Sequence, residues 1–185
     1  MRGLSLGTIN ALTLPIPGAD PWHADPGDPA LTVMTDFRER ASITVSDTST
    51  IDAALEHMKH TGVRCAFAID DENHVVVGLI TAYDIMSEKP MKQMRSAHTP
   101  RHEILVRDIM QRIADWRVAD MKLLERANVG DVARLLEESG LTHIPVVETG
   151  ERGERRLRGI LSQARVRRLL SRTEGVSGPH SRIPA

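Results

Sequence analysis

The sequence has little of several features that define common protein classes. There is one cysteine, Cys65, so no intrachain disulfide can form and no cysteine cluster for zinc exists. This agrees with a reducing compartment, the cytoplasm. Aromatic residues make up 3% of the chain, so aliphatic residues and methionine must fill the core. The formal net charge of −1 over 185 residues provides no bulk attraction to nucleic acid or anionic membranes.

Long apolar runs and catalytic signatures are missing as well. No stretch approaches the roughly 20 residues of a membrane helix, and the apolar-leaning stretch 4–14 is closed by Pro15 and Pro17 without a cleavage site. We therefore expect a cytoplasmic protein. No P-loop, Gly-x-Ser-x-Gly turn, Cys-x-x-Cys or paired-carboxylate signature stands out, so the sequence predicts a protein that is not an enzyme.

Two histidine pairs have the spacing of metal ligands on a helix. They are His57 with His60 and His98 with His102. Neither pair has an obvious third ligand nearby, so exposed polar histidines are the expectation and no metal site is predicted.

An internal repeat is the most informative feature of the sequence. A helix-like apolar spacing of i, i+3, i+4 and i+7 occurs twice, 78 residues apart. The residues are Ile51, Ala54, Leu55 and Met58 in the first copy and Val129, Val132, Ala133 and Leu136 in the second. Both segments have helix start and stop signals. These are Ser49 with Asp52 before Gly62, and Asn128 with Asp131 before Gly140.

Each glycine is followed by an apolar strand, a polar turn, a return strand and a short helix. The predicted strands are 63–69 and 75–80 in the first copy, and 141–147 and 157–161 in the second. The short helices begin near Thr81 and Ser162, and the leading strands are predicted at 43–45 and 121–124. Residues 104–116 are predicted to form a helix that leads into the second copy. Neither copy alone could cover both faces of so small a sheet, so the two are expected to pack together.

The predicted organisation therefore has five parts. An extended proline-rich arm, 1–30, contains Trp22 as its one large apolar anchor, and both disorder and packing on a partner are open for it. The first repeat spans 31–86, a linker 87–103, the second repeat 104–172, and a flexible tail 173–185.

The turn after the last strand carries a resemblance to a known family. It contains Gly78–Ile85 (GLITAYDI) in the first copy and Gly159–Val166 (GILSQARV) in the second. Together with Leu141–Val147 (LTHIPVV), this order of elements resembles the CBS domain, named after cystathionine β-synthase, over about residues 33–172. The motif is Gly, two apolar residues, Thr or Ser, two variable residues and Asp, and finding it at the same place in two matching repeats makes the resemblance specific.

The resemblance implies a fold and a function. The fold is α/β, of the α+β type, with two β-α-β-β-α repeats packed with pseudo-two-fold symmetry and two clefts between them. In the family these clefts bind AMP, ADP, ATP or S-adenosylmethionine, some pairs bind nothing, and homodimers are common. The implied function is a regulatory sensor that binds an adenine nucleotide, needs no cofactor, and signals to an unknown effector protein.

Thr81 and Asp84 have two interpretations that both stay open. A Thr followed three residues later by Asp at a helix start is a capping box that needs no ligand. The same helix N-terminus offers N–H groups and a partial positive charge to a phosphate, with Thr81 as a hydroxyl donor. Asp84, an acceptor when ionised, suits the two hydroxyls of a ribose.

Each cleft is implied to draw on both repeats. Cleft A would combine Leu79, Thr81, Asp84, Met121, Leu141 and Thr142. Cleft B would combine Ile43, Val63, Arg64, Ile160, Ser162 and Arg165. Cleft B departs from the family pattern because Arg165 stands where the ribose-binding Asp belongs, and this makes ribose binding there doubtful. Either Arg165 turns to solvent, or with Arg64 it faces a bound anion such as a polyphosphate.

Two alternative functions follow from other features. A ligand-free dimerisation or docking module is possible if Thr81 and Asp84 only cap a helix. A cluster of late arginines could contact RNA, DNA or an acidic partner, against a solvated face as the simpler account. These arginines are Arg152, Arg155, Arg156, Arg158, Arg165, Arg167, Arg168 and Arg172. Cys65 is expected to be a small core residue.

Overall fold

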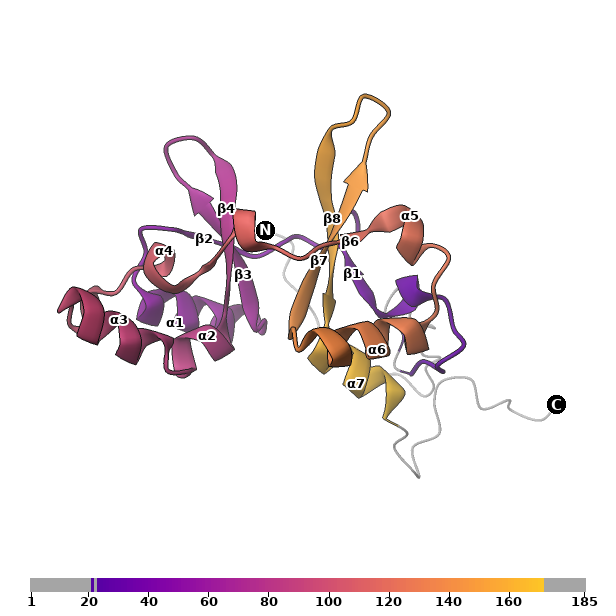
Figure 1. Ribbon diagram of the computed structural model, residues 1–185, viewed down its shortest axis with the longest axis horizontal. Helices are drawn as coiled ribbons and strands as arrows, with labels where there is room; N and C mark the ends of the chain where they lie inside the picture. The colour runs from indigo at the N-terminus through magenta and orange to yellow at the C-terminus, as the bar shows by residue number, and fades with distance from the viewer. Residues whose placement is uncertain (1–20, 22, 172–185) are drawn as a thin grey trace, which may run out of the picture.

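The computed structural model describes residue 21 and residues 23–171, and its helices and strands form two halves that lie side by side. In Figure 1 the longer helices of both halves lie along one side of the molecule and the two long hairpins extend from the other. Trp22 and the predicted tail lie outside the described residues, as does most of the predicted arm. In the described part of the chain, no helix is long and apolar enough to cross a membrane.

The first half contains a four-stranded sheet in the order β2-β3-β4-β5. Its strands are β2 (Thr44–Ser46), β3 (Cys65–Asp70), β4 (Val75–Thr81) and β5 (Gln111–Arg112). Strand β2 runs parallel to β3, and β3, β4 and β5 are antiparallel neighbours. The helices are α1 (Ile51–Thr61), α2 (Ala82–Met86), α3 (Lys89–Ala97) and α4 (Val106–Ile109), with a 3-10 turn η2 (Arg101–Glu103) between the last two.

The second half repeats this plan with the order β1-β8-β7-β6. Its strands are β1 (Met34–Asp36), β6 (Ala119–Asp120), β7 (His143–Thr149) and β8 (Arg155–Ser162). Its helices are α5 (Met121–Leu124), α6 (Val129–Ser139) and α7 (Gln163–Leu170). The 3-10 turn η1 (Ala30–Val33) precedes β1, and η3 (Ile113–Asp115) lies between β5 and β6. The predicted fold class, two mixed α and β repeats, is confirmed.

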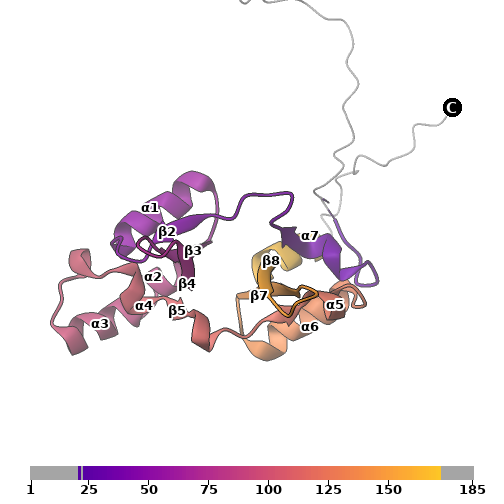
Figure 2. The same cartoon turned by 90° about the horizontal axis from the view of Figure 1, so that it is seen from above.

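The two halves exchange edge strands. Strand β1 lies at the start of the predicted first repeat but pairs antiparallel with β8 of the second. Strand β5, in the segment that leads to the second repeat, pairs with β4 of the first. The chain therefore crosses between the halves twice, through residues 37–43 and 113–118, and Figure 2 shows both crossings from above. Neither sheet is built from one continuous stretch of sequence.

The glycine of each motif allows this exchanged strand to approach. A Cβ on Gly159 would lie 2.6 Å from the carbonyl oxygen of Thr35 in β1. A Cβ on Gly78 would lie 2.5 Å from Met110 Sδ and 2.9 Å from the carbonyl oxygen of Gln111 in β5. Both glycines adjoin a shift in strand register, where a bulge bends the hairpin. The motif glycine is thus explained by close backbone contact.

The caps of the two repeat helices agree largely with the sequence signals. Asn128 and Asp131 form the predicted capping box of α6. Gly62 and Gly140 end α1 and α6 with φ of 70° and 67°, in the left-handed region that a Cβ disfavours. The prediction of Ser49 as the N-cap of α1 is wrong, because the Thr50 side chain accepts the bond from Ala53 N.

Three other sequence predictions differ from the structure. Residues 121–124 form α5, not a leading strand, because the Asp120 side chain caps a helix there and the strand β6 ends just before it. Residues 104–116 do not form one helix, since α4 stops at Ile109 and the chain turns extended to pair as β5. The polar segment 87–103 contains α3, whose Pro90 is buried against the first half.

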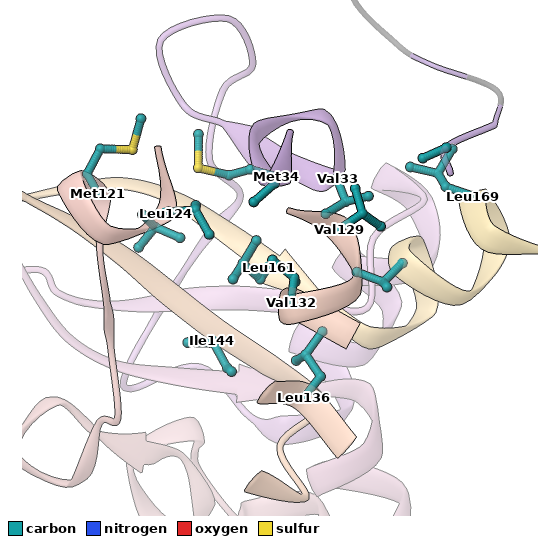
Figure 3. Packing of buried hydrophobic residues seen from close by; sticks show 14 residues of the cluster. Val33, Met34, Met121, Leu124, Val129, Val132, Leu136, Ile144, Leu161 and Leu169 are labelled. Carbon is teal, nitrogen blue, oxygen red and sulfur yellow. The ribbon is translucent and has the colours of Figure 1, made fainter. Parts of the chain in front are cut away.

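Each half has its own apolar core, and a third cluster joins them. Ile51, Ile80 and Ile85 lie in the core of the first half, and Val129, Leu136 and Leu161 in that of the second. Figure 3 shows the second core, to which Val33 and Met34 contribute from the start of the predicted first repeat. The joining cluster consists of Phe67, Leu79 and Ile160, with Phe37 and Trp116 of the crossing segments packed against it.

Residues 24–36 pack along the second half. Ala24 N donates to the carbonyl of Leu169, and Ala30 N donates to that of Ala127. Asp36 forms an ion pair with Arg158 of β8, both largely buried. This part of the predicted arm and first repeat is therefore structurally part of the second half, and the exchange of β1 continues it.

Candidate functional site

The candidate site lies where the two halves meet, above the joining cluster of Phe67, Leu79 and Ile160. The start of α2 from the first half faces residues 140–143 of the second, and the start of α7 faces residues 62–65 of the first. The repeat offset makes these two arrangements equivalent. Two pockets result, one at each predicted cleft.

Cleft A is the smaller pocket, of about 210 Å³. Five of its six predicted residues line it, and Met121 does not. The lining residues are Leu79, Thr81, Tyr83, Asp84, Lys89, Gln111, Gly140, Leu141, Thr142 and His143. Its volume lies below the roughly 300–1,000 Å³ of typical small-molecule pockets, so a ligand would need the walls to move apart.

Met121 lies outside cleft A because of the local secondary structure. It is the first residue of α5 and only 5% exposed, in the core of the second half. Figure 3 shows it at the edge of that core, beside Leu124. Its prediction as a cleft residue depended on a leading strand at 121–124, and the strand is β6, directly before it.

Thr81 and Asp84 form the complete capping box of α2. The backbone N of Asp84 donates to Thr81 Oγ1 over 3.0 Å, and the backbone N of Thr81 donates to Asp84 Oδ2 over 2.9 Å. Thr81 Oγ1 also donates its proton to Asp84 Oδ2, at 2.6 Å. A hydroxyl has one proton, so in this geometry Thr81 has none left for a phosphate.

The second carboxylate oxygen of Asp84 forms an ion pair with Lys89, a residue that the sequence analysis did not predict for the site. Lys89 Nζ lies 2.6 Å from Asp84 Oδ1 and 3.4 Å from the carbonyl oxygen of Ile109. The Asp84 side chain is 14% exposed and that of Lys89 46%. The acid and the base therefore neutralise each other at the wall of cleft A, and a ribose would have to displace Lys89 from Oδ1.

Cleft B is larger, about 570 Å³, and all six of its predicted residues line it. The lining residues are Thr35, Phe37, Ala41, Ile43, Gly62, Val63, Arg64, Cys65, Phe67, His143, Ile160, Ser162, Ala164, Arg165 and Arg168. Arg165 is half-buried, and the Ser162 side chain makes no capping bond to α7. Arg165 and Arg64 both lie in the wall of cleft B.

His143 lies between the two clefts and lines both. Burial is the main cause that lowers its pKa, to about 4, with Arg64 lowering it further and Asp84 opposing. The imidazole is therefore neutral at physiological pH, and Thr142 Oγ1 lies 3.1 Å from its Nδ1. Cys65 holds the equivalent place in the first half, 78 residues earlier, and burial raises the pKa of its thiol to about 12. Cys65 is therefore also neutral at physiological pH. The sequence analysis expected a small core residue, and Cys65 is partly buried, packed against the joining cluster.

Lys89, Gln111 and His143 are the polar wall residues that the sequence analysis missed. Gln111 reaches cleft A because β5 is exchanged, and Lys89 because the polar segment forms α3. Of the three, only His143 could have been found from the sequence, because it directly follows the predicted cleft residue Thr142 and is the repeat equivalent of Cys65. The late arginines divide: Arg158 pairs with Asp36 and Arg156 with Glu154, while Arg165 and Arg168 line cleft B.

Comparison with known proteins gives a consistent result. The family described as the CBS domain matches residues 32–90 and 106–172. The crystal structure of CBSX2 of Arabidopsis thaliana in complex with AMP is similar, with 27% identity and a TM-score of 0.50, over 77% of this chain and 95% of that chain. A search of curated proteins found no significant match.

Two archaeal structures share the fold at lower identity. An uncharacterized conserved protein of Pyrococcus horikoshii is 23% identical, with a TM-score of 0.53 over 77% of this chain and 92% of that chain. Protein MJ1225 of Methanocaldococcus jannaschii is 20% identical, with a TM-score of 0.52 over 75% of this chain and 48% of that chain. Since the family matches in two copies that together cover more than half of the sequence, the chain belongs to the CBS-domain family and carries a tandem pair of its repeats.

Proposed function

We propose that this protein is a regulatory module that binds an adenine nucleotide in cleft A and passes the signal to a partner protein. The observation that carries the proposal is the position of Asp84. Its carboxylate is at the first turn of α2, in the wall of a pocket that both repeats form. The AMP complex of CBSX2 supports this class of ligand for a similar pair. The proposal keeps the cytoplasmic location expected from the sequence.

The ligand would be held by residues of both repeats. Asp84 would accept hydrogen bonds from the ribose hydroxyls once Lys89 leaves Oδ1, and Lys89 would then be free to approach a phosphate. Leu141 would supply apolar surface for an adenine, and Leu79 of the opposite repeat, 1% exposed in the closed pocket, would do so once the walls move apart. Because the closed pocket is small, binding selects or creates a more open packing of the repeats. That difference between two packings is what a partner could detect.

Titration calorimetry with AMP, ADP, ATP and S-adenosylmethionine tests the proposal on wild type and Asp84→Asn. We expect one adenosine ligand to bind and its affinity to fall about ten-fold or more in Asp84→Asn, through loss of a charge-assisted hydrogen bond. Asp131→Asn is the matched control, because Asp131 occupies the same capping-box position in α6, away from both clefts. Equal losses in the two variants, or no binding by wild type, would contradict the proposal.

A second candidate function is a ligand-free module for dimerisation or docking. The observation that favours it is the complete capping box of Thr81 and Asp84, which satisfies both side chains without a ligand. In the same helix α2, Tyr83 and Met86 are 68% and 69% exposed, and such exposed apolar side chains suit a contact with another chain. Light scattering of wild type and of the double variant Tyr83→Ser/Met86→Ser distinguishes the candidates. A homodimer lost in this variant, without nucleotide binding in wild type, would favour assembly.

A further inference from the structure

A further cavity, of about 420 Å³, lies at the two hairpins, away from both clefts. It is lined by Val76 of the first hairpin, by the crossing segment 113–118 and by the second hairpin, β7-β8. In Figure 1 the two hairpins stand on either side of this crossing segment. We call the cavity the hairpin groove, and its lining residues are Val76, Ile113, Trp116, Val118, Val147, Arg155, Arg156 and Leu157. None of these residues lines cleft A or cleft B, so the groove is a separate surface that both halves form.

The wall of the hairpin groove is mostly apolar and partly exposed. Ile113 is 52% exposed, although it is a large aliphatic residue. Trp116 is held in place, because its indole Nε1 donates to the carbonyl of Gln111 over 3.1 Å. Its ring also packs on that of Phe67, with the ring centroids 5.9 Å apart. Exposed apolar surface beside a fixed aromatic side chain is typical of interaction sites, because little side-chain freedom is lost on binding.

The charged side chains that line the groove are both positive. Arg155 and Arg156 line it, and among its described lining residues there is no aspartate or glutamate. Arg156 is paired with Glu154, at 3.7 Å. The exposed Arg155 is in no ion pair with another described residue. The groove thus combines apolar surface with one arginine whose charge the described part of the chain does not neutralise.

We propose that the hairpin groove binds a short segment of a partner protein in which an acidic residue lies next to bulky apolar ones. The apolar side chains would bury against Ile113 and Val118, and the carboxylate would accept paired hydrogen bonds from Arg155. A nucleic acid suits the groove less well, because bases stack on open aromatic faces. The aromatic ring in the described wall, that of Trp116, is packed on Phe67 instead.

A hydrogen bond connects the hairpin groove to cleft A. Gln111 lines cleft A, and its carbonyl is the acceptor for the indole of Trp116 in the groove. Leu79, another wall residue of cleft A, belongs to the joining cluster against which Trp116 packs. A nucleotide that moves the walls of cleft A apart would therefore also shift the groove. This link rests on the proposed nucleotide function, whereas docking of the peptide segment does not need it.

A phage-displayed library of random short peptides, selected on the immobilised whole chain, tests the groove. We expect the enriched peptides to combine acidic residues with bulky apolar ones. Measured by fluorescence polarisation, they should bind Ile113→Ser/Arg155→Glu about ten-fold or more weakly than wild type, because this variant loses apolar contact and reverses the charge. Leu123→Ser/Arg126→Glu is the matched control and should bind as wild type does, since both residues are exposed and neither lines the groove.

Three results would overturn the docking site. They are a selection that enriches no acidic and apolar peptide, an equal loss of affinity in the two double variants, and single-stranded RNA of random sequence that binds as tightly with the same dependence on Arg155. Unchanged melting temperatures show that the variants are folded. Arg155→Gln, a milder change at an exposed position, repeats the comparison if the double variant melts at a lower temperature.

The same titration with saturating AMP tests the link to cleft A. A peptide affinity that changes by about two-fold or more supports the link, and an unchanged affinity with AMP bound refutes it. If the peptide binds and none of the adenosine ligands does, the proposed nucleotide function fails while the docking site stands. The two failures are therefore distinguishable.

Discussion

Clefts A and B occupy equivalent places in the two repeats, but they differ at the first turn of the helix that each contains. In cleft A, Asp84 caps α2 and is held by Lys89. In cleft B, Arg165 takes the equivalent place and α7 is not capped by Ser162. The two repeats therefore share one backbone plan, while the charge at the first turn of the helix in each cleft is reversed. Three predictions probe this asymmetry.

The largest expected effect concerns His143 and pH. Its pKa is about 6.5 in the unfolded chain and about 4 in the folded one, so between these values the unfolded state binds more protons. The contribution of His143 to the free energy of unfolding should be fully present above about pH 6.5. It should decrease as the pH falls, so that by pH 4 the free energy of unfolding is lower by up to about 3 kcal/mol. Urea unfolding across this range measures it. Cys65, the equivalent residue in the first half, does not titrate there.

His143→Asn should flatten this part of the stability profile. His57→Asn, at an exposed position of α1, is the matched control and should keep the wild-type slope. An identical pH dependence in wild type and His143→Asn would show that burial at the junction does not govern the imidazole.

The next effect compares the exchanged strands through their glycines. Gly159→Ala should destabilise the protein by about 2 kcal/mol, because the new Cβ meets the backbone of β1 at 2.6 Å. Gly78→Ala should cost less, since its nearest obstacle is the flexible side chain of Met110 and the backbone oxygen of Gln111 is farther away, at 2.9 Å. Chemical denaturation gives both values. Gly27→Ala, with no atom within 4 Å of the new Cβ, is the control, and an equal cost for all three would refute the explanation.

The smallest effect tests Lys89 as a competitor of the ribose. Lys89→Met should leave Asp84 Oδ1 free and tighten the binding of adenosine, which has no phosphate, by about two- to five-fold. Lys92→Met is the control, since Lys92 pairs with Glu88 on the same helix and does not line either cleft. Weaker binding of adenosine to Lys89→Met would mean that the lysine orients the carboxylate instead of competing for it.

Periodic segments were predictable from the sequence, whereas of the short strands only β2 was, as the leading strand predicted at 43–45. The repeat helices and the hairpins appeared because apolar spacing, glycine stops and polar turns agree over many residues. Strands β1, β5 and β6 have two or three residues each and are defined by distant pairing, which a sequence window does not contain. This is why the sequence predicts a strand at 121–124 and does not predict that β1 and β5 are exchanged between the two halves.

The same division holds for the candidate site. Thr81, Asp84, Leu141 and Thr142 lie in motifs next to long elements, and the structure brings them to one pocket. Lys89 comes from the predicted linker and Gln111 from the start of the predicted second repeat, and only the folded chain shows that both reach cleft A.

The pairing of β1 with β8 has a consequence for protein synthesis. Residues 34–36 leave the ribosome more than a hundred residues before residues 155–162, their neighbours in the finished sheet. During translation the second sheet cannot be completed until almost the whole described chain has emerged. Until then the backbone groups of β1 that pair with β8 have no partner in that sheet. Such non-local pairing slows folding. The order of translation thus makes the first residues of this sheet among the last to be fixed.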